Sequence, residues 1–168
     1  MKRLAPTRLN GVLAVLVLAL GVALVVVMTR SDSPGGSGSA DTSSEHAAVT
    51  EAATDQVTAF LDIDHESVDE QLQTVLDGAT GEFKKQYAAQ LETIKAQAEE
   101  QQSSADATIL KVGISTLTPE SATVFVAANT DITSHATNGK VRTVPWRIQL
   151  DLVKEGERWL TAGLQFVN

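Results

Sequence analysis

The pattern of apolar and polar positions divides the chain into an apolar start, a short polar stretch, a helical part and a strand part. Residues 9–29 carry no charge and are almost entirely Leu, Val, Ala and Gly. About 20 apolar residues at about 1.5 Å each span a hydrocarbon core of about 30 Å. A helix of this composition would be apolar on all sides, so it could not pack as one face of a soluble domain. The stretch predicts a transmembrane helix.

The charges that flank this stretch predict its orientation. Lys2, Arg3 and Arg8 precede it, whereas only Arg30 follows it closely and Asp32 offsets that charge. By the positive-inside rule, the N-terminus lies in the cytoplasm and residues 31–168 lie outside the cell membrane. We therefore expect a single-pass membrane protein with a cytoplasmic stub and anchor at residues 1–30.

A cleaved signal peptide is the rival interpretation of the apolar stretch. Such a peptide has an apolar core of about 7 to 15 residues that ends just before a small-x-small cleavage site. Here the core is longer, and the nearest candidate site, which ends at Ala40, lies about ten residues beyond it. The chain contains no Cys, so lipoprotein processing, disulfides and thiolate chemistry are excluded. We expect the anchor to remain uncleaved.

A linker is predicted between the anchor and one exported domain. Residues 31–44 are rich in Ser, Gly and Asp, a composition that favours a flexible coil over a packed element. The remaining residues, 45–168, are enough for one domain and too few for two.

Three segments after the linker have apolar residues at helical spacing. The first begins with a capping box at Thr42 and Glu45. The second runs from residue 67 to 78, and the third from residue 82 to 103. Residues 98–103 are mostly polar, so we expect that end of the third helix to fray into solvent.

From residue 106 the apolar positions recur every second residue, which is typical of half-buried strands. The four predicted strands lie around residues 110–114, 122–128, 144–152 and 158–167. Asn138-Gly139 predicts a turn, and Pro145 predicts an edge or a bulge because proline cannot donate to a ladder. In the first strand the alternation assigns one face to Leu110, Val112 and Ile114. In the last strand it assigns one face to Leu160, Ala162, Leu164 and Phe166, and the other to Trp159, Thr161, Gly163 and Gln165.

Helices followed by antiparallel strands, each apolar on one side, predict an α+β domain. We expect three helices packed on a curved, four-stranded antiparallel sheet. Residues 31–168 hold nine basic and 21 acidic residues, a net charge of −12. This charge repels phosphate backbones, so nucleic acid is not an expected partner, and solubility is its simplest explanation.

The ionisable residues form no recognisable catalytic or metal-binding pattern. We expect His46 and His135 to be solvated, and the ligand spacing around His65, in residues 62–66, matches no established metal site. No base is paired with a proton donor or an oxyanion partner. We therefore expect a non-enzymatic protein without a cofactor or a metal.

Five residues of the last two strands are the candidates for a pocket or an interface. Arg147, Gln149 and Asp151 share one face, which lines a polar pocket if it points inward and is an ordinary wet sheet face if it points to solvent. Trp146 and Trp159 could stack on a ligand, although large aromatic residues on strands more often belong to the core or an interface.

The order of elements and several short motifs resemble the Mce-associated membrane proteins of actinobacteria. The resemblance lies in the N-terminal anchor, in residues 60–64 (Phe-Leu-Asp-Ile-Asp) leading to residues 80–83 (Thr-Gly-Glu-Phe) and Tyr87, and in the last strand that begins at Arg158. It implies a cone-shaped exported domain of the cystatin, nuclear-transport-factor-2-like or SnoaL-like kind. It also implies an accessory or assembly role in an Mce-type lipid import complex, and it supplies no set of functional residues.

Two other functions stay open. Inner-membrane components of type IV secretion machines also join one N-terminal span to a cone-fold exported domain. A SnoaL-like binder or enzyme for small molecules is the other, and a cone filled by large side chains would argue against it. The expected partners are the membrane and Mce transporter or other envelope proteins, with self-association as a further option. The sheet face and the helical arm that ends near Ser103 are the expected contact surfaces.

Overall fold

The computed structural model describes residues 39–167, so the predicted transmembrane helix lies outside the described part of the chain. Within residues 39–167, no helix has both the length and the apolar character that a bilayer span requires. The described residues form four α-helices followed by most of one antiparallel sheet. A short strand lies between the first two helices.

The four helices cover the first half of the described chain. They are α2 (Ser39–Leu61), α3 (Val68–Asp77), α4 (Gly81–Ala88) and α5 (Leu91–Gln101). Helix α3 begins after Ser67 and ends before Gly78, as predicted, although the Ser67 side chain makes no capping hydrogen bond. Helix α2 begins at Ser39, so Thr42 lies inside the helix and the last six residues of the expected linker are helical.

The predicted third helix is two helices. The chain turns at residues 89–90, where Ala89 N donates to Lys85 O and Gln90 N donates to Tyr87 O, and α5 begins at Leu91. The expectation that its end frays is wrong. Gln102 adopts a left-handed conformation with φ 46°, and Ser103 is only 8% exposed because its N–H donates to Ala98 O and its carbonyl accepts from His65 N.

The five strands form one antiparallel sheet in sequence order. They are β1 (Ile63–Asp64), β2 (Ser104–Leu117), β3 (Ser121–Thr133), β4 (Arg142–Glu155) and β5 (Arg158–Phe166). A 3₁₀ helix, η1 (His135–Thr137), and the predicted turn at Asn138-Gly139 connect β3 to β4. The predicted α+β class is confirmed. The sheet has five strands instead of the predicted four. The additional strand, β1, has two residues, which is too short for any alternation to show in the sequence.

The ladders have three register shifts, at Leu110 and Ser115 of β2 and at Ala162 of β5, and those at Leu110 and Ala162 move apolar residues away from their predicted faces. In β2, Ile109 pairs with Ala128 and Lys111 pairs with Ala127, so Leu110 is an extra residue and is 56% exposed. The prediction that Leu110 shares the apolar face of Val112 is therefore wrong. In β5, Gly163 pairs with Asp151 and Thr161 pairs with Leu152, which leaves Ala162 as the extra residue.

The bulge at Ala162 moves the start of β5 to the opposite face. Trp159 and Thr161, which the alternation placed away from the apolar face, are buried at 6% and 0% exposure. After the bulge, Leu164 and Phe166 pack on the core as predicted. Pro145 lies where an edge was expected: β5 pairs with β4 only from Ile148 to Glu155, so the part of β4 that contains Pro145 pairs only with β3.

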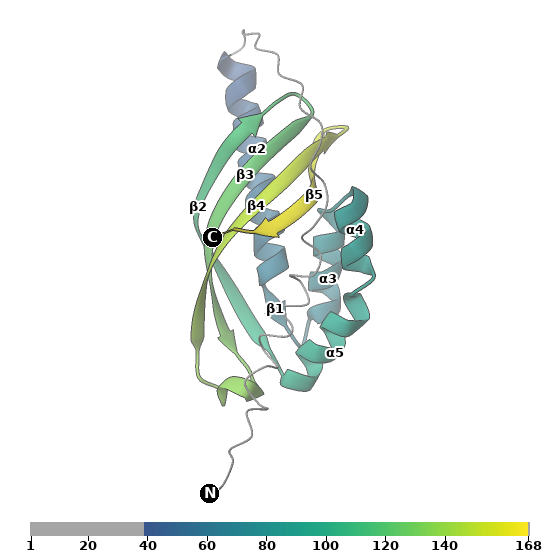
Figure 1. Ribbon diagram of the computed structural model, residues 1–168, viewed down its shortest axis with the longest axis vertical. Helices are drawn as coiled ribbons and strands as arrows, with labels where there is room; N and C mark the ends of the chain where they lie inside the picture. The colour runs from purple at the N-terminus through teal and green to yellow at the C-terminus, as the bar shows by residue number, and fades with distance from the viewer. Residues whose placement is uncertain (1–38, 168) are drawn as a thin grey trace, which may run out of the picture.

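The helices lie together on one side of the curved sheet, and α2 runs along the strands (Figure 1). The core lies between these two layers. Its fully buried side chains include, from α2 and α3, Val49, Val57 and Val75, and from β3 and β4, Val124, Val126, Ile148, Leu150 and Leu152. The opposite side of the sheet, which we call the outer face, has no covering element among the described residues (Figure 1).

Candidate interaction surface on the outer sheet face

The five candidate residues are divided between the two sides of the sheet. Trp146 and Trp159 belong to the side that the helices cover, and Trp159 is buried. Arg147, Gln149 and Asp151 alternate with the fully buried Ile148 and Leu150, so they lie on the outer face. The structure therefore does not join the five residues into one pocket.

Trp146 belongs to a cluster of five aromatic rings, which we call the aromatic cluster. Its ring centroid lies 5.0 Å from that of Phe166, and its Nε1 donates a hydrogen bond to Thr130 Oγ1 at 3.1 Å. Phe60 of α2 lies 6.2 Å from Phe166 and 5.9 Å from Tyr87, with Phe83 as the fifth member at 6.4 Å from Phe60.

The aromatic cluster lies where α2, α4, the start of β4 and the end of β5 meet. Burial raises the pKa of the Tyr87 phenol, so this group stays protonated at physiological pH. The ring centroids of Phe60 and Tyr87 are 5.9 Å apart and those of Phe83 and Tyr87 are 6.0 Å apart, within the range that aromatic pairs favour in a packed core.

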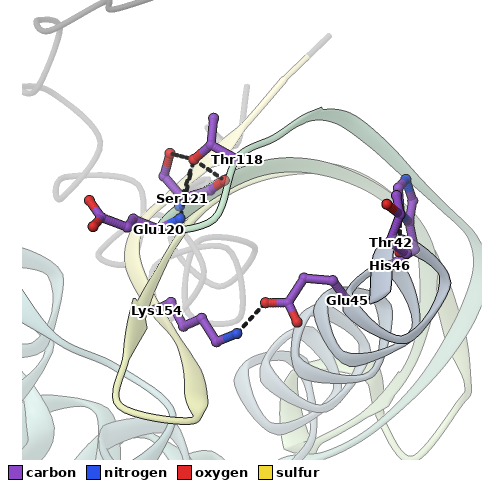
Figure 2. Close-up of polar contacts among 7 residues, drawn as sticks. All are labelled: Thr42, Glu45, His46, Thr118, Glu120, Ser121 and Lys154. Carbon is purple, nitrogen blue, oxygen red and sulfur yellow. Dashed lines mark hydrogen bonds and ion pairs between the residues drawn. The ribbon is translucent and has the colours of Figure 1, made fainter. Parts of the chain in front are cut away.

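Trp159 lies under an ion pair at the other end of the sheet. The Nζ atom of Lys154 is 5.7 Å from the centre of the Trp159 ring and pairs with Glu45 of α2. Figure 2 shows Glu45 and Lys154 pointing toward one another across the gap between the helix and the β4–β5 hairpin. Trp159 Nε1 is buried and finds no hydrogen-bond partner among the described residues.

The same end of the sheet carries a tight turn between β2 and β3. Thr118 Oγ1 accepts from Ser121 N at 2.9 Å, and the backbone N–H of Thr118 donates to Ser121 O at 2.8 Å (Figure 2). The carbonyl of Glu120 accepts from the backbone N–H of Lys154 at 2.9 Å, which joins this turn to β4. Lys154 also pairs with Glu45, so this end of the sheet contacts both the β2–β3 turn and the first turns of α2.

On the outer face, a small polar network surrounds Asp151. Its Oδ1 accepts from Thr123 Oγ1 at 3.1 Å and from Gln149 Nε2 at 3.3 Å. Gly163, the partner of Asp151 across the β4–β5 ladder, has no side chain, and a Cβ placed there would lie 3.4 Å from Asp151 Oδ2. The glycine leaves the Asp151 carboxylate accessible from the outer face.

The outer face also exposes a large aromatic side chain that is not among the five candidate residues. Phe125 of β3 is 42% exposed, and its ladder partners are Gly113 of β2 and Gln149 of β4. A Cβ at Gly113 would meet no atom within 4 Å, so the space beside Phe125 is open. The signal in the sequence was one aromatic residue at a position that the alternation assigns to the polar face.

The acidic loop at residues 62–66 connects elements of the fold. Asp62 Oδ1 accepts from the Ala107 backbone N–H at 2.6 Å, and Asp64 Oδ1 accepts from Glu66 N at 3.0 Å. Burial raises the pKa of Asp62.

In residues 39–167, no group of three or more His, Cys, Asp or Glu side chains has an arrangement that could hold a metal ion. His46 and His135 are exposed, as expected.

Three solved structures show where this fold occurs elsewhere. The VirB8 homologue CagV of Helicobacter pylori has a TM-score of 0.58 at 11% identity, covering 73% of this chain and 98% of that one. An IcmL-like type IV secretion system protein of Legionella pneumophila has a TM-score of 0.58 at 11% identity, covering 79% and 94%. VirB8 of Agrobacterium tumefaciens has a TM-score of 0.56 at 10% identity, covering 80% and 96%. Identities this low show a shared fold only.

Sequence comparison gives the family. No curated protein matches the chain. The association with Mce lipid import stays a prediction, because neither the family match nor the structural matches bear on it. One family model matches residues 9–168, which is nearly the whole chain. The chain therefore belongs to the family described as "Uncharacterized protein Rv1363c/MT1408-like".

Proposed function

We propose that this chain is a non-enzymatic, membrane-anchored assembly factor of a multiprotein complex in the cell envelope. The observation that carries the proposal is the contrast between the two sides of the sheet. The helix side is filled by the core and the aromatic cluster, whereas the outer face presents Phe125, Arg147 and Asp151 with no covering element in residues 39–167. An exposed aromatic residue among charged ones is typical of a protein interface.

The shared fold favours one kind of complex over the other. All three solved structures reported above are named as type IV secretion proteins or VirB8 homologues. This supports an assembly role like that of the inner-membrane components of secretion machines more than a role in Mce lipid import. We keep the Mce complex as the competing assignment that the experiment must distinguish.

The family match supports an anchor that belongs to the protein's function. The match begins at residue 9, so it includes the whole apolar stretch at residues 9–29. An anchor followed by a short linker would hold the domain close to the outer surface of the cell membrane.

A small-molecule binder or enzyme is the weaker candidate. In this fold a pocket would have to lie between the helices and the sheet, and there Phe60 contacts Phe83, Tyr87 and Phe166. The polar network around Asp151 lies on the other side of the sheet. A carboxylate on an open face is not shielded from water, which weakens the electrostatic effects on which catalysis depends.

The experiment is chemical crosslinking in intact membranes, followed by purification of the full-length chain and mass spectrometry of the attached proteins. Recovery of secretion-channel subunits supports the proposal in its favoured form. Recovery of Mce substrate-binding proteins or their permease supports the assembly role and moves it to lipid import. Recovery of no other envelope protein, from membranes in which the chain is abundant, contradicts the proposal.

A further inference from the structure

The middle of the outer face carries its charges in a defined order along the strands. The ladder registers place its residues in three adjacent rows that cross the sheet, and a further pair, Asp106 and Asp131, lies beyond these rows. The basic row is Lys111, Ala127 and Arg147; the central row is Gly113, Phe125, Gln149 and Gln165; the acidic row is Thr116, Thr123, Asp151 and Gly163. Alternate residues of a strand are about 6.8 Å apart, so the basic and acidic rows lie at equal distances on either side of the central row.

This order is complementary to itself under one rotation. A two-fold axis that runs across the strands, along the central row, lays the basic row of one copy over the acidic row of the other. Arg147 of each copy then faces Asp151 of the other, and Phe125 meets its own symmetry mate at the axis. A two-fold axis parallel to the strands would instead stack the basic rows on one another, which is unfavourable.

We propose that the outer face binds a second copy of this chain, in a two-fold dimer whose axis follows the central row. The small side chains of the three rows support this, because Gly113, Ala127 and Gly163 let a second sheet approach closely. Phe125, at 42% exposure, supplies the aromatic contact at the centre. The charge pairing selects the two-fold axis that runs across the strands and excludes the two-fold axis parallel to them.

The predicted anchor favours association between copies of the chain in general. Two chains held by their anchors in the same membrane meet at a higher effective concentration than two chains in solution. A modest interface can therefore be occupied in the membrane. The dimer occupies the face from which the proposed function is argued, so it rests on that proposal and deepens it: the unit that joins the envelope complex is a two-fold pair of this chain.

The chain has no Cys, so a single introduced Cys reports on one position in full-length protein in its membrane. Gln149→Cys places a thiol on the axis and leaves Phe125 in place. Packed sheets lie about 10 Å apart, which is too far for a disulfide, so a short bis-maleimide with a spacer of about 8 Å is the reagent. Lys84→Cys, at an exposed position of α4, is the matched control.

We expect the Gln149→Cys chain to form a covalent dimer and the Lys84→Cys chain to form at least about ten-fold less. Equal crosslinking of the two variants would overturn the proposal. A product in which the thiol introduced by Gln149→Cys joins mainly to a different protein would also overturn it, and would assign the outer face to another partner. Because these products differ in mass, failure of the dimer is distinguishable from failure of the proposed function.

Charge reversal tests the orientation of the two copies. In the Gln149→Cys background, Arg147→Asp places two carboxylates opposite each other, and Asp151→Arg places two guanidinium groups opposite each other. The pair occurs twice in a two-fold dimer, so either single reversal should lower the crosslinked fraction about three-fold or more. The double reversal restores the pairing and should restore the crosslinking.

Loss of crosslinking in both single variants without recovery in the double variant would overturn the proposed axis. Arg147 is held through its backbone, where it pairs with Ala127 in the β3–β4 ladder and its carbonyl accepts from Val167 N. Arg147→Asp keeps this backbone pairing and should leave the fold intact. Unchanged thermal melting of that variant confirms that any lost crosslinking reports on association.

Discussion

Asp62 shows how burial acts on a single carboxyl group in this fold. Burial raises its pKa, the hydrogen bond from the Ala107 N–H lowers the pKa, and the nearby charge of Asp106 raises it, with a net shift upward. The folded chain therefore holds this proton more tightly than the unfolded chain does. The resulting stabilisation is fully present below the unfolded pKa of about 3.9 and is lost as the pH rises through the folded pKa.

Asp62→Asn separates the charge from the hydrogen bond. The amide oxygen can still accept from Ala107, but there is no charge to desolvate. We expect the variant to melt at pH 7 no lower than the wild type, and to show a weaker loss of stability between about pH 4 and pH 7. Thermal melts followed by Trp fluorescence across this range measure both. A lower melting temperature at pH 7 with an unchanged pH dependence would contradict the assigned cause.

The candidate residues show what a sequence can reveal at this scale. Arg147, Gln149 and Asp151 follow the alternation of β4, so their common face could be predicted. The exposure of Phe125 could not, because it depends on Gly113 lying beside it across the β2–β3 ladder. Trp159 could not be placed either, because its face is set by a bulge at Ala162.

At the scale of elements, the strands were predictable and their irregularities were not. Alternation located β3 and β4 because neither contains an unpaired extra residue within the apolar run. The extra residues at the bulges, Leu110 in β2 and Ala162 in β5, are apolar and fit the alternation of apolar and polar residues. The sequence therefore gives no sign that the strand changes face there. The strand β1 arises only from contact with β2, through the pairs Ile63–Ala105 and Asp64–Ser104. Such long-range pairing leaves no local signal.

Two phenylalanines on opposite sides of the sheet test the division into a core side and an outer face. Phe60 contacts three other rings and is 9% exposed, whereas Phe125 is 42% exposed. We expect Phe60→Ala to lower the free energy of unfolding by about 3–5 kcal/mol, because it leaves a cavity in the aromatic cluster. Phe125→Ala should cost less than about 1 kcal/mol in the monomer.

Urea unfolding of the full chain in detergent, followed by Trp fluorescence, measures both variants at a protein concentration low enough to keep the chains apart. Similar losses for the two variants would mean that the outer face is part of the core. A small loss for Phe60→Ala would mean that the aromatic cluster is loosely packed and leaves room for a ligand.

At the scale of the whole molecule, the fold class followed from the order of the elements, since helices that precede a run of strands pack on one face of an antiparallel sheet. The function does not follow from the fold, because one architecture supports many activities. The proposal of a protein interface rests instead on the position of the side chains of Phe125, Arg147 and Asp151. They lie on the outer face, opposite to the helices and the aromatic cluster.

The most direct test is the mass of the native particle that contains the full-length chain, measured by native mass spectrometry after gentle solubilisation of membranes. One copy of the chain has a mass of 17.8 kDa. An assembly factor should be found in particles much heavier than two copies, with a fixed ratio of this chain to its partners. If all of the chain is instead recovered as particles of one or two copies, under conditions that keep other envelope complexes intact, the chain is not an assembly factor.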